Sequence, residues 1–446
     1  MDAKNLNLQK AKSVKNDEFY TKLEDIQNEL CHYESFFKGK IVYCNCDDPF
    51  ESNFFRYFTE NFRKLGLKQL LITGFNSPLN SDKPVSLFPN DEPVNESQSY
   101  FFKIKDIEIK EGRWSRTFVR KLLRQKGVVK RLLTGDATYK AGDFRSKECL
   151  FLLRQADIVV TNPPFSLWRE FISVLEEYEK KYLIIGNKNL VTYKKVFPLI
   201  KDCKMWFGCT DVKEFYDKNG NICKFGNISW FTNIPVKKEL KEIELTEHYY
   251  DENGKPKKES LEKYLPYDNY DAINVDRLKD IPCDYYGVMG VPITFLDKFN
   301  PSYLYEEMDD AVRKRGLPSL EQTKPKEQVC QTGCGQAESH PVVSEGNGSI
   351  NESSSNGYAE WFDIVTIGTS PDLFTPSKKY YDVLYHGKNN FVGKEHIAVN
   401  QCLTIRVKEK PNPVYYTAKD VDGYLIMPYN RILIIRKKDK LIGRCL

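Results

Sequence analysis

Asp157 to Phe165, DIVVTNPPF, places an amide side chain, two prolines and an aromatic ring directly after an apolar run. The letters IVV predict a buried parallel strand, which must end at Pro163-Pro164 because proline cannot donate to a strand ladder. Ligands of open α/β sheets bind outside the carboxyl ends of strands. There the Asn162 side-chain oxygen and the Pro163 carbonyl can both accept from one NH2 group, and Phe165 offers a ring face. The alternative is a Pro-Pro turn that only closes a core strand.

The same run resembles the Asn/Asp-Pro-Pro-Tyr/Phe signature of amino-methyltransferases that use S-adenosylmethionine. An exocyclic amine is a poor nucleophile because its lone pair is conjugated with the ring. Two acceptors on its N–H groups would aim that lone pair at the methyl donor and stabilise the developing positive charge, without a strong general base. A base in a duplex must flip out to reach such a pocket. We therefore expect Asn162, Pro163, Pro164 and Phe165 to be catalytic.

A second candidate element lies upstream, in GDFRS. Asp143 precedes Asn162 by 19 residues. In amino-methyltransferases of this type, an Asp-Phe pair shortly before the catalytic Asn contacts the adenine of the cofactor. The resemblance implies that Asp143 accepts a hydrogen bond from the adenine amine and that Phe144 packs on the ring. Asp136, 26 residues before Asn162, is a competing candidate, and an ordinary Asp turn is the alternative for either.

CNCDDP, residues 44–49, follows the first expected strand, where most methyltransferases place a glycine-rich loop. The carboxylates of Asp47 and Asp48 are candidates for binding the methionine ammonium or the ribose hydroxyls of the cofactor. The residues that follow, FESN at 50–53, occupy the glycine positions, which argues against close backbone approach to the cofactor.

Several further segments occur in a fixed order along the chain. They are NDEFYT at 16–21, FGNISWFTN at 225–233, DNYDAINV at 268–275, GVMGVPITFL at 287–296 and RILIIRK at 431–437. Together with the motifs above, they resemble the EcoRI-type adenine-specific DNA methyltransferases over about residues 10–300. The resemblance implies N6-adenine methylation of double-stranded DNA with S-adenosylmethionine, in a restriction–modification setting where an endonuclease is a genetic partner only. It also implies that Asn16, Phe19, Tyr20 and Thr21 lie over the methionine end of the cofactor.

The pattern of expected elements favours an α/β fold. Expected strands at 40–46, 69–73, 157–161 and 182–186 alternate with expected helices at 22–37, 53–65 and 167–178. With the resemblance, this predicts a Rossmann-like methyltransferase domain, whose mostly parallel sheet carries helices on both faces, and a second, β-richer region. The expected divisions are a cofactor-binding catalytic domain (1–205), a DNA target-recognition region (206–320), a mobile linker (321–357) and a C-terminal β-rich extension (358–446).

A basic stretch near residues 100–131 looks inserted into the catalytic domain. It includes Arg113, Arg116 and Arg120, whose spacing suits contact with DNA phosphates. A solvated amphipathic helix is the alternative. The net charge of +5 and the pI of about 8.4 permit a nucleic-acid partner without requiring one.

Composition narrows the class of protein further. The N-terminal segment has no apolar signal region and no apolar run reaches membrane-spanning length, so we expect a cytoplasmic protein without membrane attachment. Twelve cysteines in such a chain are typical of reduced intracellular thiols. Cys330, Cys334 and His340 form a metal-like cluster that lacks a fourth ligand, so no metal is expected.

The chemistry alone leaves other substrates open. Cytosine N4 and a protein glutamine amide also offer a planar NH2, and only the family resemblance favours adenine. An RNA methyltransferase is a further alternative, although no appended RNA-binding module is visible. The last alternative is a catalytically inactive DNA-binding relative. The intact Asn162-Pro163-Pro164-Phe165 run argues against this alternative.

Overall fold

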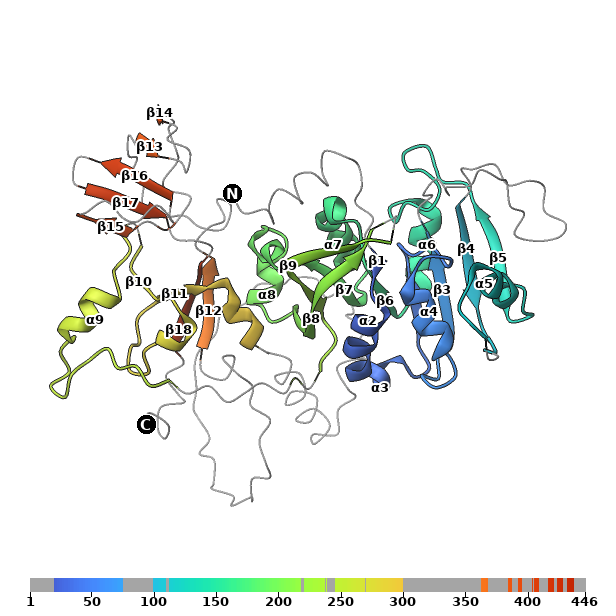
Figure 1. The fold of residues 1–446 in the computed structure, drawn as a ribbon, viewed down its shortest axis with the longest axis horizontal. Helices are drawn as coiled ribbons and strands as arrows, with labels where there is room; N and C mark the ends of the chain where they lie inside the picture. The colour runs from blue at the N-terminus through green and yellow to red at the C-terminus, as the bar shows by residue number, and fades with distance from the viewer. Residues whose placement is uncertain are drawn as a thin grey trace, which may run out of the picture.

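Up to residue 300, the computed structural model describes the ranges 20–74, 99–109, 112–217, 220–236, 245–268 and 270–299, together with residue 238. Beyond residue 300 it describes the stretches 362–367, 384–386, 392–394, 403, 405–408, 416–420, 423–427 and 431–436. Figure 1 shows two regions along the long axis of the molecule, one built on a large sheet with helices and one on smaller sheets.

A nine-stranded sheet has the order β1-β8-β9-β7-β6-β2-β3-β4-β5 (Figure 1). Its strands are β1 (Tyr20–Thr21), β2 (Ile41–Cys44), β3 (Gln69–Thr73), β4 (Ser99–Ile104), β5 (Val128–Leu133), β6 (Ile158–Thr161), β7 (Lys181–Asn187), β8 (Trp206–Tyr216) and β9 (Ile222–Thr232). The central strands β7, β6, β2 and β3 are parallel. The flanking strands pair antiparallel on both sides. The sheet is therefore mixed, with its parallel pairs confined to the centre.

Helices cover both faces of this sheet, because its central strands bury apolar side chains on both sides. On β2, Val42 and Cys44 belong to one hydrophobic core and Tyr43 to the other, because neighbouring side chains of a strand point to opposite faces. The Val42 side is covered by α2 (Leu23–Leu30), α3 (Glu34–Phe37), α4 (Asn53–Glu60) and α5 (Arg116–Leu123). The Tyr43 side is covered by α6 (Lys147–Gln155), α7 (Trp168–Glu177) and α8 (Phe197–Lys201). Strands buried on both faces are typical of parallel α/β sheets.

The second region contains two smaller sheets. The first has the order β10-β11-β18-β12, formed by Ile273–Asn274, Met289–Pro292, Arg431–Arg436 and Phe362–Ile367. The second has the order β14-β13-β16-β17-β15, formed by Val392–Lys394, Leu384–His386, Tyr416–Asp420, Gly423–Met427 and Ile405–Val407. The short helix α9 (Lys258–Lys263) lies at the outer end of this region (Figure 1). Because β18 lies between β11 and β12, residues 431–436 complete a sheet that residues 273–292 begin.

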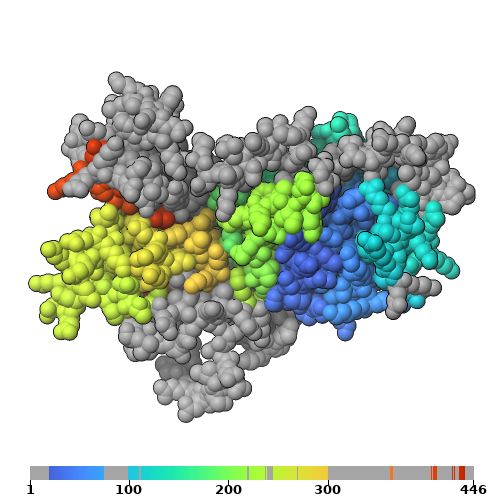
Figure 2. Space-filling view, viewed as in Figure 1, coloured from blue at the N-terminus to red at the C-terminus, as the bar shows by residue number. Residues whose placement is uncertain are grey.

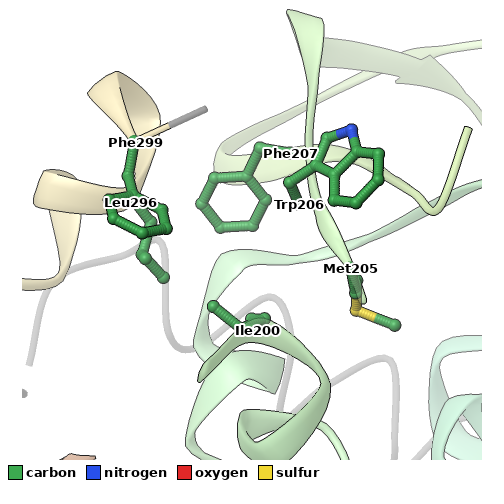
Figure 3. Close-up of a pocket in the computed structure, with 6 residues that line it drawn as sticks. All are labelled: Ile200, Met205, Trp206, Phe207, Leu296 and Phe299. Carbon is green, nitrogen blue, oxygen red and sulfur yellow. The ribbon is translucent and has the colours of Figure 1, made fainter. Parts of the chain in front are cut away.

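The two regions share one hydrophobic core. Residues of α7 and α8 belong to the same buried cluster as Ile432 and Ile434 of β18. At the junction, the apolar side chains of Ile200, Phe207 and Leu296 point toward one another around a cavity of about 10 Å³ (Figure 3). Figure 2 shows the second region at one end of the molecule and the β4, α5 and β5 segment at the opposite end.

Two expected divisions of the chain differ from the structure. The boundary at 205/206 falls inside the nine-stranded sheet, because β8 and β9 pair with its strands β1 and β7. The expected basic insertion near 100–131 forms β4, α5 and β5, which extend the edge of the same sheet. Its helix buries Val119, Leu122 and Leu123 against the core, so this part of the chain is a built-in layer of the fold.

Candidate active site

The Asn-Pro-Pro-Phe turn leaves the sheet at its centre. β6 is buried at all its positions. Asn162, the next residue in the chain, is half-buried, and Pro163 after it is buried. Phe165 begins a 3-10 helix (Phe165–Leu167) that leads into α7. The indole N–H of Trp168 donates to the Ile185 carbonyl oxygen at 2.9 Å, which fixes the start of α7 on β7. The turn is thus held at both ends, between β6 and the first residue of α7.

Asn162 lies at the point where the strand order reverses. From β2 the chain moves outward to β3, whereas from β6 it moves outward to β7 on the other side. In open α/β sheets, the carboxyl ends of the strands at such a switch point form the ligand-binding crevice. The residues after β2 and after β6 therefore meet at one place, as the sequence predicted for Asp47, Asp48 and Asn162.

Asp47 ties these two strand ends together. Its carboxylate accepts from the Thr161 hydroxyl at 2.6 Å and from the Ser52 hydroxyl at 2.6 Å. Ser52 also caps α4 by accepting from the backbone N–H groups of Phe54 and Phe55. Burial raises the pKa of the Asp47 carboxyl to about 6, and the two hydroxyl donors oppose this shift. Asp47 thus positions the residue before Asn162, and its oxygens already have partners within the protein.

Asp48 faces the surface more than Asp47 does. It is half-exposed, and its side chain accepts from the backbone N–H of Phe50 at 2.8 Å. Its backbone lies against Gly74 at the end of β3, where an added Cβ would come within 3.2 Å of the Asp48 Cα. Gly142 has φ +81°, and an added Cβ there would lie 2.4 Å from the Gly74 oxygen. This close packing brings the ends of β2 and β3 next to the turn that carries Asp143.

Tyr20 and Thr21, the described part of NDEFYT, lie beside the catalytic turn. They form β1, and Thr21 pairs with Phe215 of β8. The Phe165 ring meets the Phe215 ring edge-on, with centroids 6.3 Å apart. The Asn53 side-chain amide donates to the Thr21 carbonyl oxygen at 2.7 Å. The structure therefore joins the N-terminal motif to the Asn-Pro-Pro-Phe turn through Phe215. Asn16 and Phe19 lie outside the described residues.

Asp143 and Phe144 are both buried, and Asp143 is bound to its neighbour Arg145. The guanidinium of Arg145 donates through Nε and Nη2 to the two carboxylate oxygens at 3.0 and 2.8 Å. Phe144 packs edge-on against Phe171 of α7, with centroids 5.0 Å apart. The pair thus lies on the α7 side of the sheet, with its carboxylate engaged by an ion pair that the sequence did not indicate.

Asp136, the competing candidate, organises its own loop. One carboxylate oxygen accepts from the backbone N–H groups of Thr138 and Tyr139, and the other from that of Lys147, each at 2.9 Å. These backbone donors hold the pKa of Asp136 below its usual value. Three backbone bonds account for this carboxylate as a cap of the loop and of the first turn of α6. The Asp143 carboxylate is likewise engaged, because it accepts from the backbone N–H of Arg145 at 2.9 Å as well as from the guanidinium.

Four residues near the site were not predicted: Ser52, Thr161, Arg145 and Phe215. Ser52 carried a usable signal, since serine before an apolar helical run is typical of a helix N-cap. Thr161 and Arg145 are direct neighbours of predicted residues, yet their contacts depend on side-chain direction. Phe215 comes from β8, whose pairing with β1 no local pattern indicates.

The remaining predictions concern membranes and metals. In the part of the chain that the structure describes, no helix combines the length and apolar character needed to cross a bilayer. The sequence-level metal candidates Cys330, Cys334 and His340 lie outside the described residues.

Comparisons with known proteins agree on one family. The family model for the adenine-specific methyltransferase EcoRI matches residues 7–437. The type II methyltransferase M.EcoRI of Escherichia coli is 44% identical over 322 residues, which cover 67% of this chain and 88% of that protein. The type II methyltransferase M.MpnI of Mycoplasma pneumoniae is 36% identical over 311 residues, which cover 66% of this chain and 82% of that protein. No solved structure matches the chain.

Proposed function

This chain belongs to the adenine-specific methyltransferase EcoRI family, and we propose that it methylates N6 of a flipped-out adenine in a specific duplex DNA site. The proposed methyl donor is S-adenosylmethionine, and the proposed setting is a restriction–modification system. The observation that carries the proposal is the position of Asn162, at the switch point of a sheet whose neighbouring strand end also carries Asp47 and Asp48.

The strand order supports a Rossmann-like methyltransferase domain. The central order β7-β6-β2-β3 is parallel, reverses direction between β2 and β6, and carries helices on both faces. These are the features of a doubly wound sheet with one ligand crevice.

The residues around the crevice fit the proposed cofactor. Asp48 lies against Gly74 through its backbone, and Asp143 follows Gly142, whose own contact with the Gly74 oxygen is too close for a side chain. We assign Asp143 and Phe144 to the adenine of the cofactor and Asp48 to its ribose or methionine portion. Tyr20 and Thr21, with Asn16 and Phe19, are assigned to the methionine end. When bound, the cofactor supplies an activated methyl group on a sulfonium centre.

The chain's own residues then have distinct roles in the transfer. The Asn162 side-chain oxygen and the Pro163 carbonyl accept the two N–H groups of the target amine, which directs the nitrogen lone pair and stabilises positive charge as it develops. Pro163 and Pro164 keep the turn rigid because their φ angles are fixed. Phe165, braced by Phe215, stacks on the flipped base. Asp47 holds Thr161, and through it Asn162, in place.

DNA contact is assigned to two surfaces. Arg116 pairs with Glu51 of the loop after β2, so the start of α5 lies at the same edge of the sheet as the crevice. We propose that Arg113 and Arg116 contact phosphates there. The second region, from about residue 233 onward, is proposed to read the target sequence, because its loops and short strands follow the catalytic sheet in the chain.

Nucleoside analysis tests the reaction. Purified full-length protein is incubated with unmethylated plasmid and S-adenosylmethionine, and the digested nucleosides are identified by mass spectrometry. We expect N6-methyladenine that is absent when S-adenosylmethionine is omitted. N4-methylcytosine would overturn the choice of base, and methylation of RNA but not of duplex DNA would overturn the choice of nucleic acid.

A further inference from the structure

Arg145 covers the Asp143 carboxylate and faces the rings of Tyr139 and Phe144. Its guanidinium donates to both oxygens of Asp143 and lies 4.7 Å from the Tyr139 ring centroid and 5.2 Å from that of Phe144. A flat, delocalised group with N–H donors thus binds the buried carboxylate and faces two aromatic rings. The Arg145 side chain is 25% exposed and that of Asp143 only 11%, so the guanidinium covers the carboxylate from the solvent side.

Adenine would use the same contacts. It is planar, its amine donates N–H groups to a carboxylate, and its ring stacks on aromatic faces. Arginine shares these properties because its guanidinium is planar and presents donors in a fixed fork that matches a carboxylate. The guanidinium and an adenine cannot both occupy the outer side of Asp143.

We propose that Arg145 is a built-in competitor of the cofactor's adenine: it holds Asp143 and the ring faces in the cofactor-free protein and leaves them when the adenine enters. This inference rests on the proposed function, in which Asp143 and Phe144 bind the adenine. Arg145 therefore sets cofactor affinity, because the binding-competent state is only the fraction of molecules in which the guanidinium has moved away.

The structure offers the displaced side chain both space and a partner. Arg145 lines a half-open cleft of about 960 Å³ between the Asp143 turn, α6, α7 and the segment after β7. Glu170 of α7 lines the same cleft and, after Asp143 and Tyr139, adds to the negative field that raises the pKa of Arg145. A short rotation of the long arginine side chain exchanges one carboxylate for another, so the guanidinium leaves Asp143 without losing an anionic partner.

The first test measures cofactor affinity by calorimetry on the full-length chain, with S-adenosylmethionine and S-adenosylhomocysteine as ligands. Arg145→Ala is expected to tighten both by about three- to tenfold, which corresponds to a competitor that occupies the site for roughly two-thirds to nine-tenths of the time. Arg154→Ala is the matched control, because Arg154 of α6 lies over the Tyr178 ring and makes no described contact with Asp143. It should leave affinity unchanged.

Two further variants make the test decisive. Arg145→Lys keeps the charge but loses the planar fork, so it should tighten binding less than Arg145→Ala, and it replaces that variant if the alanine protein does not fold. Glu170→Gln removes the alternative partner and should weaken cofactor binding by about two- to threefold. In the Arg145→Ala background, Glu170→Gln should have no effect.

The outcomes separate this inference from the proposed function. Asp143→Ala should weaken cofactor binding by about fivefold or more, since an adenine donor then lacks its acceptor. If Asp143→Ala weakens binding but Arg145→Ala leaves it equal or weaker, the competitor role is overturned and the adenine site stands. If Asp143→Ala changes nothing, the adenine site itself is misplaced and both assignments fail, whether or not methyl transfer to DNA adenine is observed.

Discussion

The centre of the nine-stranded sheet and the four-stranded sheet of the second region draw their strands from very different spans of the chain. β2, β3, β6 and β7 are parallel and lie within 150 residues of one another, from Ile41 to Asn187. In the second region, β11 pairs antiparallel with β18, from Met289–Pro292 to Arg431–Arg436. The first sheet presents polar residues at the ends of its strands, whereas the second brings distant parts of the chain together. Polar residues therefore gather where neighbouring parallel strands end, and pairing between distant segments completes the region proposed to read DNA.

Truncating one isoleucine in each region tests whether the two form one cooperative unit. Ile184 of β7 and Ile434 of β18 are both fully buried in the same core. Each change to alanine should lower the free energy of unfolding by about 2–5 kcal/mol, and each should shift one shared urea transition. Tryptophan fluorescence, to which all five tryptophans of the chain contribute, and far-UV circular dichroism should give coincident curves.

The exposed Ile222 of β9 serves as the control for this pair. Its side chain is 53% exposed, and Ile222→Ala should change stability by no more than about 0.5 kcal/mol. A separate early transition in Ile434→Ala alone would show that the second region unfolds independently, despite the continuous core.

The next largest effect concerns the catalytic turn. Asn162→Ala should lower kcat by about a hundredfold or more, because the lost acceptor acts mainly on charge that develops during transfer. Cofactor affinity, measured by calorimetry, should stay within about twofold of the wild-type value. Asn28→Ala, which removes an exposed amide of α2, is the matched control and should turn over normally. Near-normal turnover in Asn162→Ala would remove this residue from the mechanism.

The buried carboxylate of Asp47 should leave a signature in the pH dependence of stability. Its folded-state pKa of about 6 lies above the ordinary value of 3.8, so the folded protein binds the proton more tightly than the unfolded chain. Stability from this group is complete below pH 3.8 and is lost as the pH rises to about 6. Relative to Asp47→Asn, which cannot titrate, the wild type should lose about 3 kcal/mol across this window.

Urea unfolding of both proteins at a series of pH values measures this difference. The wild-type and Asp47→Asn proteins share all their other titrating groups, so the difference curve isolates one carboxyl. It should fall with rising pH and then level off. A flat difference curve would mean that burial between Thr161 and Ser52 does not raise the pKa of this carboxyl above its ordinary value.

The smallest expected effect concerns the basic edge of the large sheet. Joint replacement of Arg113 and Arg116 by alanine should weaken binding to all duplexes and reduce the salt dependence, by about 0.9 in the log–log slope for each lost phosphate contact. Arg120 is left intact, since it is half-buried and its Nε is shielded from solvent. Fluorescence anisotropy at several salt concentrations measures the slope.

The control and the site survey decide how DNA recognition is divided between the two regions. Arg63 and Lys64 follow α4, at the end of that helix away from the crevice, and their joint replacement by alanine removes the same charge. It should leave the slope unchanged. The set of methylated sites in a plasmid library should be the same for the Arg113/Arg116 variant as for the wild type. A different set of sites would mean that the basic edge reads bases.

The central elements could be predicted because local patterns specify them. The apolar run ending in two prolines marks the end of β6 to the residue, and QLLIT coincides with β3 at Gln69–Thr73. The flanking strands were less accessible. The 205/206 boundary separated β8 and β9 from the sheet they belong to, because their aromatic, antiparallel pattern fits either region and only their pairing with β1 and β7 decides between them.

For the site, the sequence by itself indicated which residues follow the ends of two expected parallel strands, and the carboxyl ends of such strands are where open α/β sheets bind ligands. It placed Asn162, Asp47 and Asp48 there without any knowledge of side-chain direction. Only the tertiary structure decided that Asp47 turns inward to Thr161 and Ser52 and that Arg145 covers Asp143. The physical reason is that strand ends follow from local sequence patterns, whereas strand order and hydrogen-bond partners depend on which distant segments come together.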